Sequence, residues 1–205
     1  MASLLNMSGG SLLKKELPYD YEVEYLENNN TGERISTGIV GGPGLKIETY
    51  FTSLELATEK WAIASWDTGA GRLYAIYQNP AGKWGAGYGG YATNIANMNI
   101  NTVYHTVIEY TNKEQIVTVN GNEIIRYNKS SNFKNTKPLQ LFTLGIQSQS
   151  FRCRIGHTRI WMYDVLVRDF IPVVRDSVGC MYDKVSKQLF YNQGTGNFIV
   201  GPRVS

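Results

Sequence analysis

Three acidic residues near the start of the chain have a spacing that could support catalysis. Glu22, Glu24 and Glu27 lie within six consecutive residues. Two carboxylates about 5 Å apart perform retaining glycoside hydrolysis, one as the nucleophile and the other as the acid and base. Alternation along a strand places Glu22 and Glu24 on one face, whereas Glu27 joins them only if a bulge intervenes. Hydrolysis is therefore the less favoured of the functions that we consider.

A second candidate site is the aromatic-rich stretch between Trp61 and Tyr91. Flat rings stack on sugars while neighbouring polar groups bind the sugar hydroxyls. Trp84 and Tyr88 share one face of a regular strand and have small residues around them, which predicts accessible rings, whereas we expect Trp61 and Tyr77 in the core. Contact with another protein through the same rings is equally compatible with the pattern. The predicted glycan-binding residues are Trp66, Asp67, Arg72, Tyr74, Trp84, Tyr88 and Tyr91.

Other patterns of catalytic or metal-binding residues are weak. The two histidines, His105 and His157, stand outside any zinc-ligand spacing, and neither a Gly-x-Ser-x-Gly turn nor a phosphate-binding loop occurs. Calcium requires about 6–8 oxygen ligands, and the acids of the predicted loops do not cluster. We therefore expect no metal or other cofactor, and a turn-forming role for each loop acid: Asp67, Asp164, Asp176 and Asp183.

The first twenty residues differ in character from the rest of the chain. Ser-Leu-Leu at 3–5 recurs at 11–13 around a Gly-Gly break, and such a segment is too short and interrupted to fold alone. We expect residues 1–20 to form an arm, set apart by Pro18, that buries its apolar side chains against a neighbouring subunit or a larger assembly. The side chains expected to make this contact are Leu4, Leu5, Met7, Leu12 and Leu13.

The same segment lacks the order of a secretory signal. Lys14 and Lys15 follow the leucines instead of preceding them, and glycines and polar residues break the apolar run. No stretch of the chain approaches the roughly 20 apolar residues of a membrane helix. We therefore expect a protein that is neither exported by an ordinary signal nor inserted in a membrane.

The composition and residue pattern of 21–205 predict a single all-β domain. The 205-residue chain is 42% hydrophobic and 18% charged, which permits a sizeable core, and its net charge of +3 is too small to require a nucleic-acid partner. From Tyr19 onward apolar residues alternate with a period of two over about fourteen short segments separated by turn residues. The predicted strands are Tyr21–Leu26, Arg34–Ile39, Leu45–Phe51, Trp61–Ser65, Arg72–Gln78, Lys83–Tyr88, Val103–Tyr110, Gln115–Val119, Glu123–Tyr127, Leu139–Ile146, Arg154–Tyr163, Val165–Phe170, Val178–Tyr182 and Gln188–Tyr191. Asn120-Gly121 between two such segments is the clearest hairpin signal. This pattern predicts a two-sheet antiparallel jelly-roll sandwich.

Five segments near the two ends of the domain carry a resemblance to a known group of domains. They are Val23-Glu24-Tyr25-Leu26-Glu27, Ser36-Thr37-Gly38-Ile39, Leu166-Val167-Arg168-Asp169-Phe170-Ile171-Pro172, Gly179-Cys180-Met181-Tyr182-Asp183 and Phe190-Tyr191-Asn192-Gln193-Gly194-Thr195-Gly196-Asn197-Phe198. The sequence resembles the concanavalin A-like lectin/glucanase (laminin-G or pentraxin-like) jelly rolls found in gut bacteria and their tailed phages. Endoglucanases of this fold class carry Glu-x-Asp-x-x-Glu in the middle of the chain, whereas the acids here occupy the first strand.

The resemblance implies structural roles for residues of the C-terminal segments. Adjacent strand residues point to opposite faces, so we expect Arg168 and Asp169 to bind other groups, such as the turns at Asp183 or Asn192. Gly194 and Gly196 would let the chain turn and pack Phe198 on the sheet. Cys153 and Cys180 are either two buried thiols or one disulfide, and the two-cysteine count favours buried thiols.

The function expected from these features is structural and binding, not enzymatic. The arm and the resemblance together favour a phage virion surface protein, such as a head fibre or capsid decoration, that presents a lectin-like domain to host or mucosal glycans. Such a protein would be made in the host cytoplasm, would dock on other virion or assembly proteins through its arm and would form a homo-oligomer. The alternatives are a free carbohydrate-binding lectin at the surface of a gut bacterium and, less favoured, a glycoside hydrolase.

Overall fold

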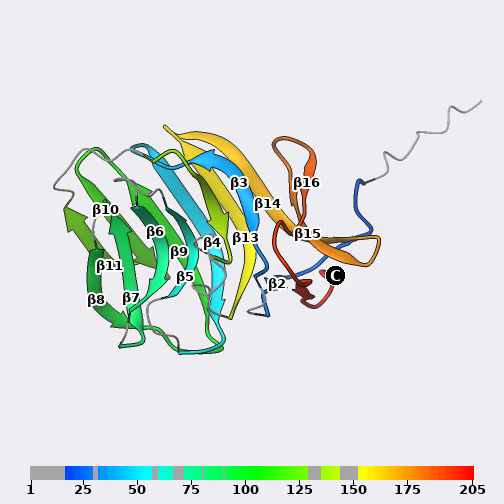
Figure 1. The fold of residues 1–205 in the computed structure, drawn as a ribbon, viewed down its shortest axis with the longest axis horizontal. Coiled ribbons are helices and arrows are strands. Elements are labelled where there is room, and N and C mark those ends of the chain that lie inside the picture. The colour runs from blue at the N-terminus through cyan, green and yellow to red at the C-terminus, as the bar shows by residue number, and fades with distance from the viewer. Residues whose placement is uncertain are drawn as a thin grey trace, which may run out of the picture.

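The computed structural model describes residues 17–29, 32–56, 60–66, 72–79, 81–89, 91–128, 135–143 and 152–205. Within these residues the chain forms β-strands and no helix (Figure 1), so none of them belongs to a helix able to cross a membrane. The strands are β1 (Tyr21–Glu22), β2 (Leu26–Glu27), β3 (Ile35–Val40), β4 (Leu45–Ser53), β5 (Lys60–Trp66), β6 (Arg72–Gln78), β7 (Lys83–Tyr88), β8 (Tyr91–Asn97), β9 (Val103–Tyr110), β10 (Glu114–Val119), β11 (Asn122–Asn128), β12 (Pro138–Leu141), β13 (Cys153–Met162), β14 (Val165–Arg175), β15 (Val178–Asp183), β16 (Gln188–Phe190) and β17 (Ile199–Val200).

The strands pair into two antiparallel sheets. The larger sheet has eleven strands, with the order β11-β10-β9-β4-β13-β14-β15-β16, and β1, β2 and β17 attach beside this path. The smaller sheet has six strands, in the order β3-β12-β5-β6-β7-β8. Neighbours such as β4 and β13 are far apart in sequence, as the crossovers of a jelly roll require. The predicted all-β sandwich is therefore confirmed.

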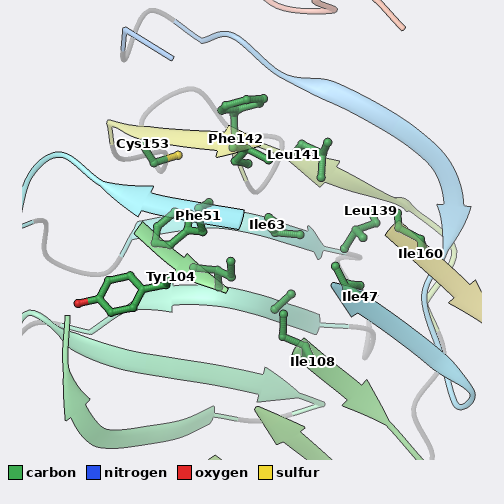
Figure 2. Close-up of a cluster of buried hydrophobic side chains, with 14 of the residues drawn as sticks. Ile47, Phe51, Ile63, Tyr104, Ile108, Leu139, Leu141, Phe142, Cys153 and Ile160 are labelled. Carbon is green, nitrogen blue, oxygen red and sulfur yellow. The ribbon is translucent and has the colours of Figure 1, made fainter. Parts of the chain in front are cut away.

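The core lies between the two sheets and follows the alternation of the strands. Ile47 and Phe51 on β4, Ile108 on β9 and Ile63 on β5 are all buried in one continuous cluster, which Figure 2 shows. Each such side chain contributes about 1.5–3 kcal/mol when it is removed from water. Lys46, Glu48 and Tyr50 on β4 and His105 on β9 alternate with the core residues and point to the opposite face of the larger sheet, where they are at least partly exposed.

Strand β14 is buried on both faces where it leaves the sandwich. Phe170 and Val174 belong to the main core, whereas Ile171 and Val173 belong to a second cluster on the other face. Tyr19 covers this second cluster, with its ring centroid 5.1 Å from that of Tyr182. The packing of the domain thus includes Tyr19, and residues 1–16 of the predicted arm lie outside the described residues.

The C-terminal segments have the structural roles that the resemblance implied. The buried carboxylate of Asp183 accepts hydrogen bonds from the backbone amides of Asp169, Val185 and Ser186. Burial alone would raise the pKa of this carboxyl, but the hydrogen bonds outweigh burial and lower it. Arg168 lies 3.6 Å from the same carboxylate, so Asp183 fixes the turn after β15.

The loop after β16 closes on Asn192. The Oδ1 atom of Asn192 accepts hydrogen bonds from the backbone amides of Arg34 and Gly194, and its Nδ2 donates to the carbonyl of Gly196. Gly196 has a φ of +77°, which suits glycine. Beyond this turn Phe198 is buried with its ring centroid 4.6 Å from that of Phe142, as predicted.

Candidate functional site

The structure overturns the prediction that the rings of Trp84 and Tyr88 are accessible. Both residues lie on one face of β7, but that face is the inner one, and each is only 1% exposed. Trp84 packs edge-on against Phe51 and Tyr104, with centroid distances of 5.8 and 5.2 Å, and Tyr88 lies 5.1 Å from Tyr110. These rings join the two sheets and are closed to a ligand.

The other predicted glycan-binding residues are not brought into a described site. Four of them have their backbones in strands of the smaller sheet, but the structure does not describe their side chains: Trp66, Arg72, Tyr74 and Tyr91. Asp67 lies wholly outside the described residues. The arm residues also lie outside the described residues: Leu4, Leu5, Met7, Leu12 and Leu13.

Trp61 and Tyr77 are buried, as predicted, and their rings stack with centroids 5.2 Å apart. Gly85 makes room for this stack, because an added Cβ there would lie 2.3 Å from the ring of Tyr77.

The three acids at the start of the domain do not share one strand. Glu22 ends β1, which pairs with β14, whereas Glu27 lies on β2, which pairs with β13. The carboxylate of Glu27 is buried and binds Arg152 and Arg154, and that of Glu22 accepts the hydroxyl hydrogen of Tyr19 at 2.7 Å. Each of these two carboxylates therefore has a local partner, and the single-strand arrangement expected for a hydrolase is wrong.

The outer face of β4, β9 and β13 gathers a continuous set of aromatic and charged side chains. Here outer face means the side of the larger sheet that points away from the smaller sheet. Lys46, Glu48 and Tyr50 alternate along β4 with the core residues, and register places each beside a residue of another strand. Lys46 pairs with Trp161 on one side and Glu109 on the other, Glu48 with Arg159, and Tyr50 with His105.

Glu48 is the electrostatic centre of this face. Its carboxylate binds Arg159 of β13 and lies 2.9 Å from Nε2 of His105 on β9, so it connects three strands. Partial burial by itself would raise the pKa of Glu48, but the hydrogen bonds with His105 and Arg159 and the Arg159 charge lower it. The network holds these polar groups in fixed positions at neutral pH.

Two aromatic rings lie among these charges. Tyr50 is 46% exposed, and its ring centroid is 5.1 Å from that of His105. Trp161 is partly exposed, and both the ammonium of Lys46 and the guanidinium of Arg159 lie 5.5 Å from its ring centroid. At this distance a cation is attracted to the face of the ring, so Lys46 and Arg159 hold Trp161 in place. We call the set Lys46, Glu48, Tyr50, His105, Arg159 and Trp161 the outer platform.

A shallow hollow of about 170 Å³ adjoins the platform at Tyr50. Arg154 lines this hollow. Its guanidinium carbon lies 4.4 Å from the ring centroid of Tyr25, and its Nε donates a 2.8 Å hydrogen bond to the carboxylate of Glu27. The hollow is lined by Glu24, Tyr25, Tyr50, Thr52, Val103, Arg154 and Gly156.

Both histidines of the chain lie near this site. His105 belongs to the platform, and His157 follows Gly156 and binds the carboxylate of Asp169. Within the described part of the chain, no group of three or more His, Cys, Asp or Glu side chains is placed to hold a metal ion. The site is therefore built from aromatic rings and ion pairs.

Sequence reasoning missed Tyr50, Trp161 and Arg154. The signal available was the alternation in Leu45–Ser53, which puts Lys46, Glu48 and Tyr50 on the face opposite the apolar residues. That pattern assigns the three residues to a solvated face but gives no sign that β9 and β13 bring His105 and Trp161 beside them. The site depends on pairings between residues about 55 to 115 positions apart in the chain.

The chain was compared with family models, curated proteins and solved structures, and the solved structures gave matches. No protein-family model and no curated protein matches the chain. A proposed carbohydrate-binding protein from Bacteroides ovatus matches in structure with a TM-score of 0.59 and 12% identity, over 90% of this chain and 62% of that one. A sialidase from Trypanosoma rangeli matches with a TM-score of 0.47 and 14% identity, over 57% of this chain, which spans only 20% of the sialidase.

A further match is the carbohydrate-binding module CBM66 from Bacillus subtilis, with a TM-score of 0.43 and 12% identity, over 72% of this chain and 97% of the module. At these identities the likeness concerns the fold. The chain has the two-sheet antiparallel β-sandwich fold that the sequence resemblance implied, and it shares this fold with the Bacteroides ovatus protein.

Proposed function

We propose that this protein binds carbohydrate through the outer platform. The observation that carries the proposal is a pair of rings, the exposed Tyr50 and the partly exposed Trp161, set among ion pairs on the outer face of the larger sheet. Sugars present apolar C–H faces that stack on aromatic rings, and hydroxyls that bond with charged side chains. Because Glu48 already binds Arg159 and His105, and Lys46 already pairs with Glu109, little ordering of these side chains is required when a ligand binds. The likeness to the Bacteroides ovatus protein agrees with this role.

We propose further that the domain binds sugar without cleaving it. A retaining glycosidase requires two carboxylates about 5 Å apart at the scissile bond. Glu27, the third acid of the sequence motif, is buried between two arginines, so it is not available to attack or protonate a sugar. Incubation of the protein with any oligosaccharide that it binds should leave that oligosaccharide intact, and product formation lost in Glu24→Gln would overturn this part of the proposal.

The experiment for carbohydrate binding compares two exposed tyrosines. Tyr50 on the platform and Tyr191 after β16 are 46% and 44% exposed, so removing either ring should affect stability to a similar, small degree. On a glycan array followed by calorimetry, Tyr50→Ala and Trp161→Ala should weaken binding at least about tenfold, which corresponds to about 1.4 kcal/mol. Tyr191→Ala should bind like the parent. Equal binding by all variants, or no binding to any glycan, would overturn the proposal.

We propose as a second function that the domain is displayed on a larger particle, as on a phage virion surface, with the arm as its attachment. Two observations favour attachment at this end. Tyr19 is fixed in the second apolar cluster, and Leu17, two residues before it, is 60% exposed and turned toward solvent. Removing residues 1–16 should leave the melting temperature unchanged and abolish self-association or incorporation into the particle, as measured by light scattering and co-sedimentation. Unchanged stoichiometry in the truncated protein would contradict attachment through the arm.

A further inference from the structure

The hollow beside the platform is small, and Gly156 is one of the residues that line it. Its volume of about 170 Å³ lies below the roughly 300–1,000 Å³ typical of pockets for drug-sized ligands, so it fits one ring-sized group. Gly156 forms part of the wall where the chain passes closest to Glu24 and Tyr50. A Cβ added at Gly156 would lie 3.0 Å from the carbonyl oxygen of Glu24 and 3.3 Å from the Cβ of Tyr50.

Arg154 is held as a directed hydrogen-bond donor in this hollow. Its Nε donates to Glu27, whose carboxylate is itself buried and also bound by Arg152, and its guanidinium carbon lies 4.4 Å from the ring centroid of Tyr25. A guanidinium has five N–H groups, so this one bond to Glu27 orients Arg154 and leaves further donors at the hollow. Glu27 is thus a positioning residue for Arg154.

Glu24 supplies the opposite chemistry at the same hollow. It is exposed and is one of the residues that line the hollow together with Arg154, and a carboxylate accepts hydrogen bonds without donating any. A sugar hydroxyl both donates and accepts, so neighbouring hydroxyls match a donor and an acceptor side by side. A carboxylate on the ligand would be attracted by Arg154 but repelled by Glu24, so it would lose hydration without a net electrostatic gain, whereas a neutral hydroxyl does not carry this cost.

We infer that the hollow receives a single neutral, hydroxyl-bearing sugar residue and discriminates against acidic sugars, with Arg154 and Glu24 as the selecting pair. This inference rests on the proposed carbohydrate binding by the platform. The Tyr50 ring belongs to both, so a chain stacked on the platform would place one terminal residue in the hollow.

The test uses two trisaccharides with the same core, one ending in galactose and the other in glucuronic acid. The parent protein should prefer the galactose-terminated form at least about tenfold by calorimetry. Glu24→Gln should weaken binding of the galactose form about tenfold and narrow or reverse the preference, because the repulsion is removed. Arg154→Lys should weaken binding of both forms. The matched control is Glu123→Gln, which removes an exposed carboxylate on β11 and should change the binding of neither trisaccharide.

The outcomes separate the inference from the proposed function. If Trp161→Ala lost binding while Glu24→Gln and Arg154→Lys bound both trisaccharides like the parent, the proposed sugar site in the hollow would be wrong. Carbohydrate binding at the platform would still be supported. Preference of the parent for the glucuronate form would also contradict the inferred selection of a neutral sugar in the hollow. Failure of the parent to bind either trisaccharide or any array glycan would overturn both. Gly156→Ala should reduce binding of the galactose form, because the added methyl group would lie 3.0 Å from the carbonyl oxygen of Glu24 and force the wall of the hollow to shift. Binding equal to that of the parent would contradict a ligand seated against this wall.

Discussion

The carboxylate of Glu48 on β4 lies 2.9 Å from the imidazole Nε2 of His105 on β9. The two residues are 57 positions apart in sequence, and the same carboxylate also binds Arg159 of β13. One acid therefore connects three neighbouring strands on the face where we place the binding site. The arrangement also has consequences for stability that can be measured.

Acid should destabilise the protein partly through Glu48. Because its partners favour the ionised carboxylate, the pKa of Glu48 is lower in the folded protein than its ordinary value of 4.5. The stabilisation is fully present above that ordinary value and is lost as the pH falls through the folded-state pKa. In urea unfolding measured from pH 7 to pH 3, Glu48→Gln should be less stable at pH 7 and show a shallower loss toward acid. If the unfolding free energy of Glu48→Gln fell as steeply between pH 7 and pH 3 as that of the parent, this role of Glu48 would be contradicted.

Trp84 should matter for stability and not for ligand binding. Its ring is buried between Phe51 and Tyr104 at the centre of the sandwich, so Trp84→Ala should cost about 3–5 kcal/mol of unfolding free energy. Trp84→Phe should cost less because it preserves part of the contact. Denaturant unfolding gives both values. If Trp84→Phe kept full stability but lost glycan binding, Trp84 would have to be accessible after all.

The turn at Gly194 should tolerate no side chain. A Cβ added there would lie 1.8 Å from the carbonyl oxygen of Gly32, a contact that only backbone movement can relieve. Gly194→Ala should therefore lower the melting temperature by several degrees. Gly42 is the matched control, because nothing lies within 4 Å of an added Cβ at that position, so Gly42→Ala should be nearly neutral. Similar melting temperatures for the two variants would show that the loop after β16 adapts.

The two cysteines should be unreactive while the protein is folded. Cys153 and Cys180 are both free and buried, and burial raises the pKa of the Cys180 thiol to about 12 and that of Cys153 well above its ordinary value. Since the thiolate is the reacting form, a thiol reagent at pH 8 should label neither residue until denaturant is added. Labelling of one equivalent in the native protein would mean that one strand, β13 or β15, opens readily.

Much of the strand pattern was available from local sequence. Arg72–Gln78, Lys83–Tyr88 and Val103–Tyr110 are strands with the predicted bounds, and Asn120 and Gly121 have the positive φ values of a tight hairpin turn. The predicted strands omitted Tyr91–Asn97 and Ile199–Val200. The first mixes small and polar residues, and the second is a two-residue pairing with β2, so neither shows clear alternation.

The sequence by itself determined the all-β class, most strands, their turns and the pairs of residues that share a face. Only the tertiary structure decided which face is buried, and it placed Trp84 and Tyr88 in the core while leaving Tyr50 and Trp161 at the surface. The physical reason is that alternation is a property of one strand, whereas burial depends on which strands pair and which sheet covers them. Those contacts join residues far apart in the chain, and local spacing carries no record of them.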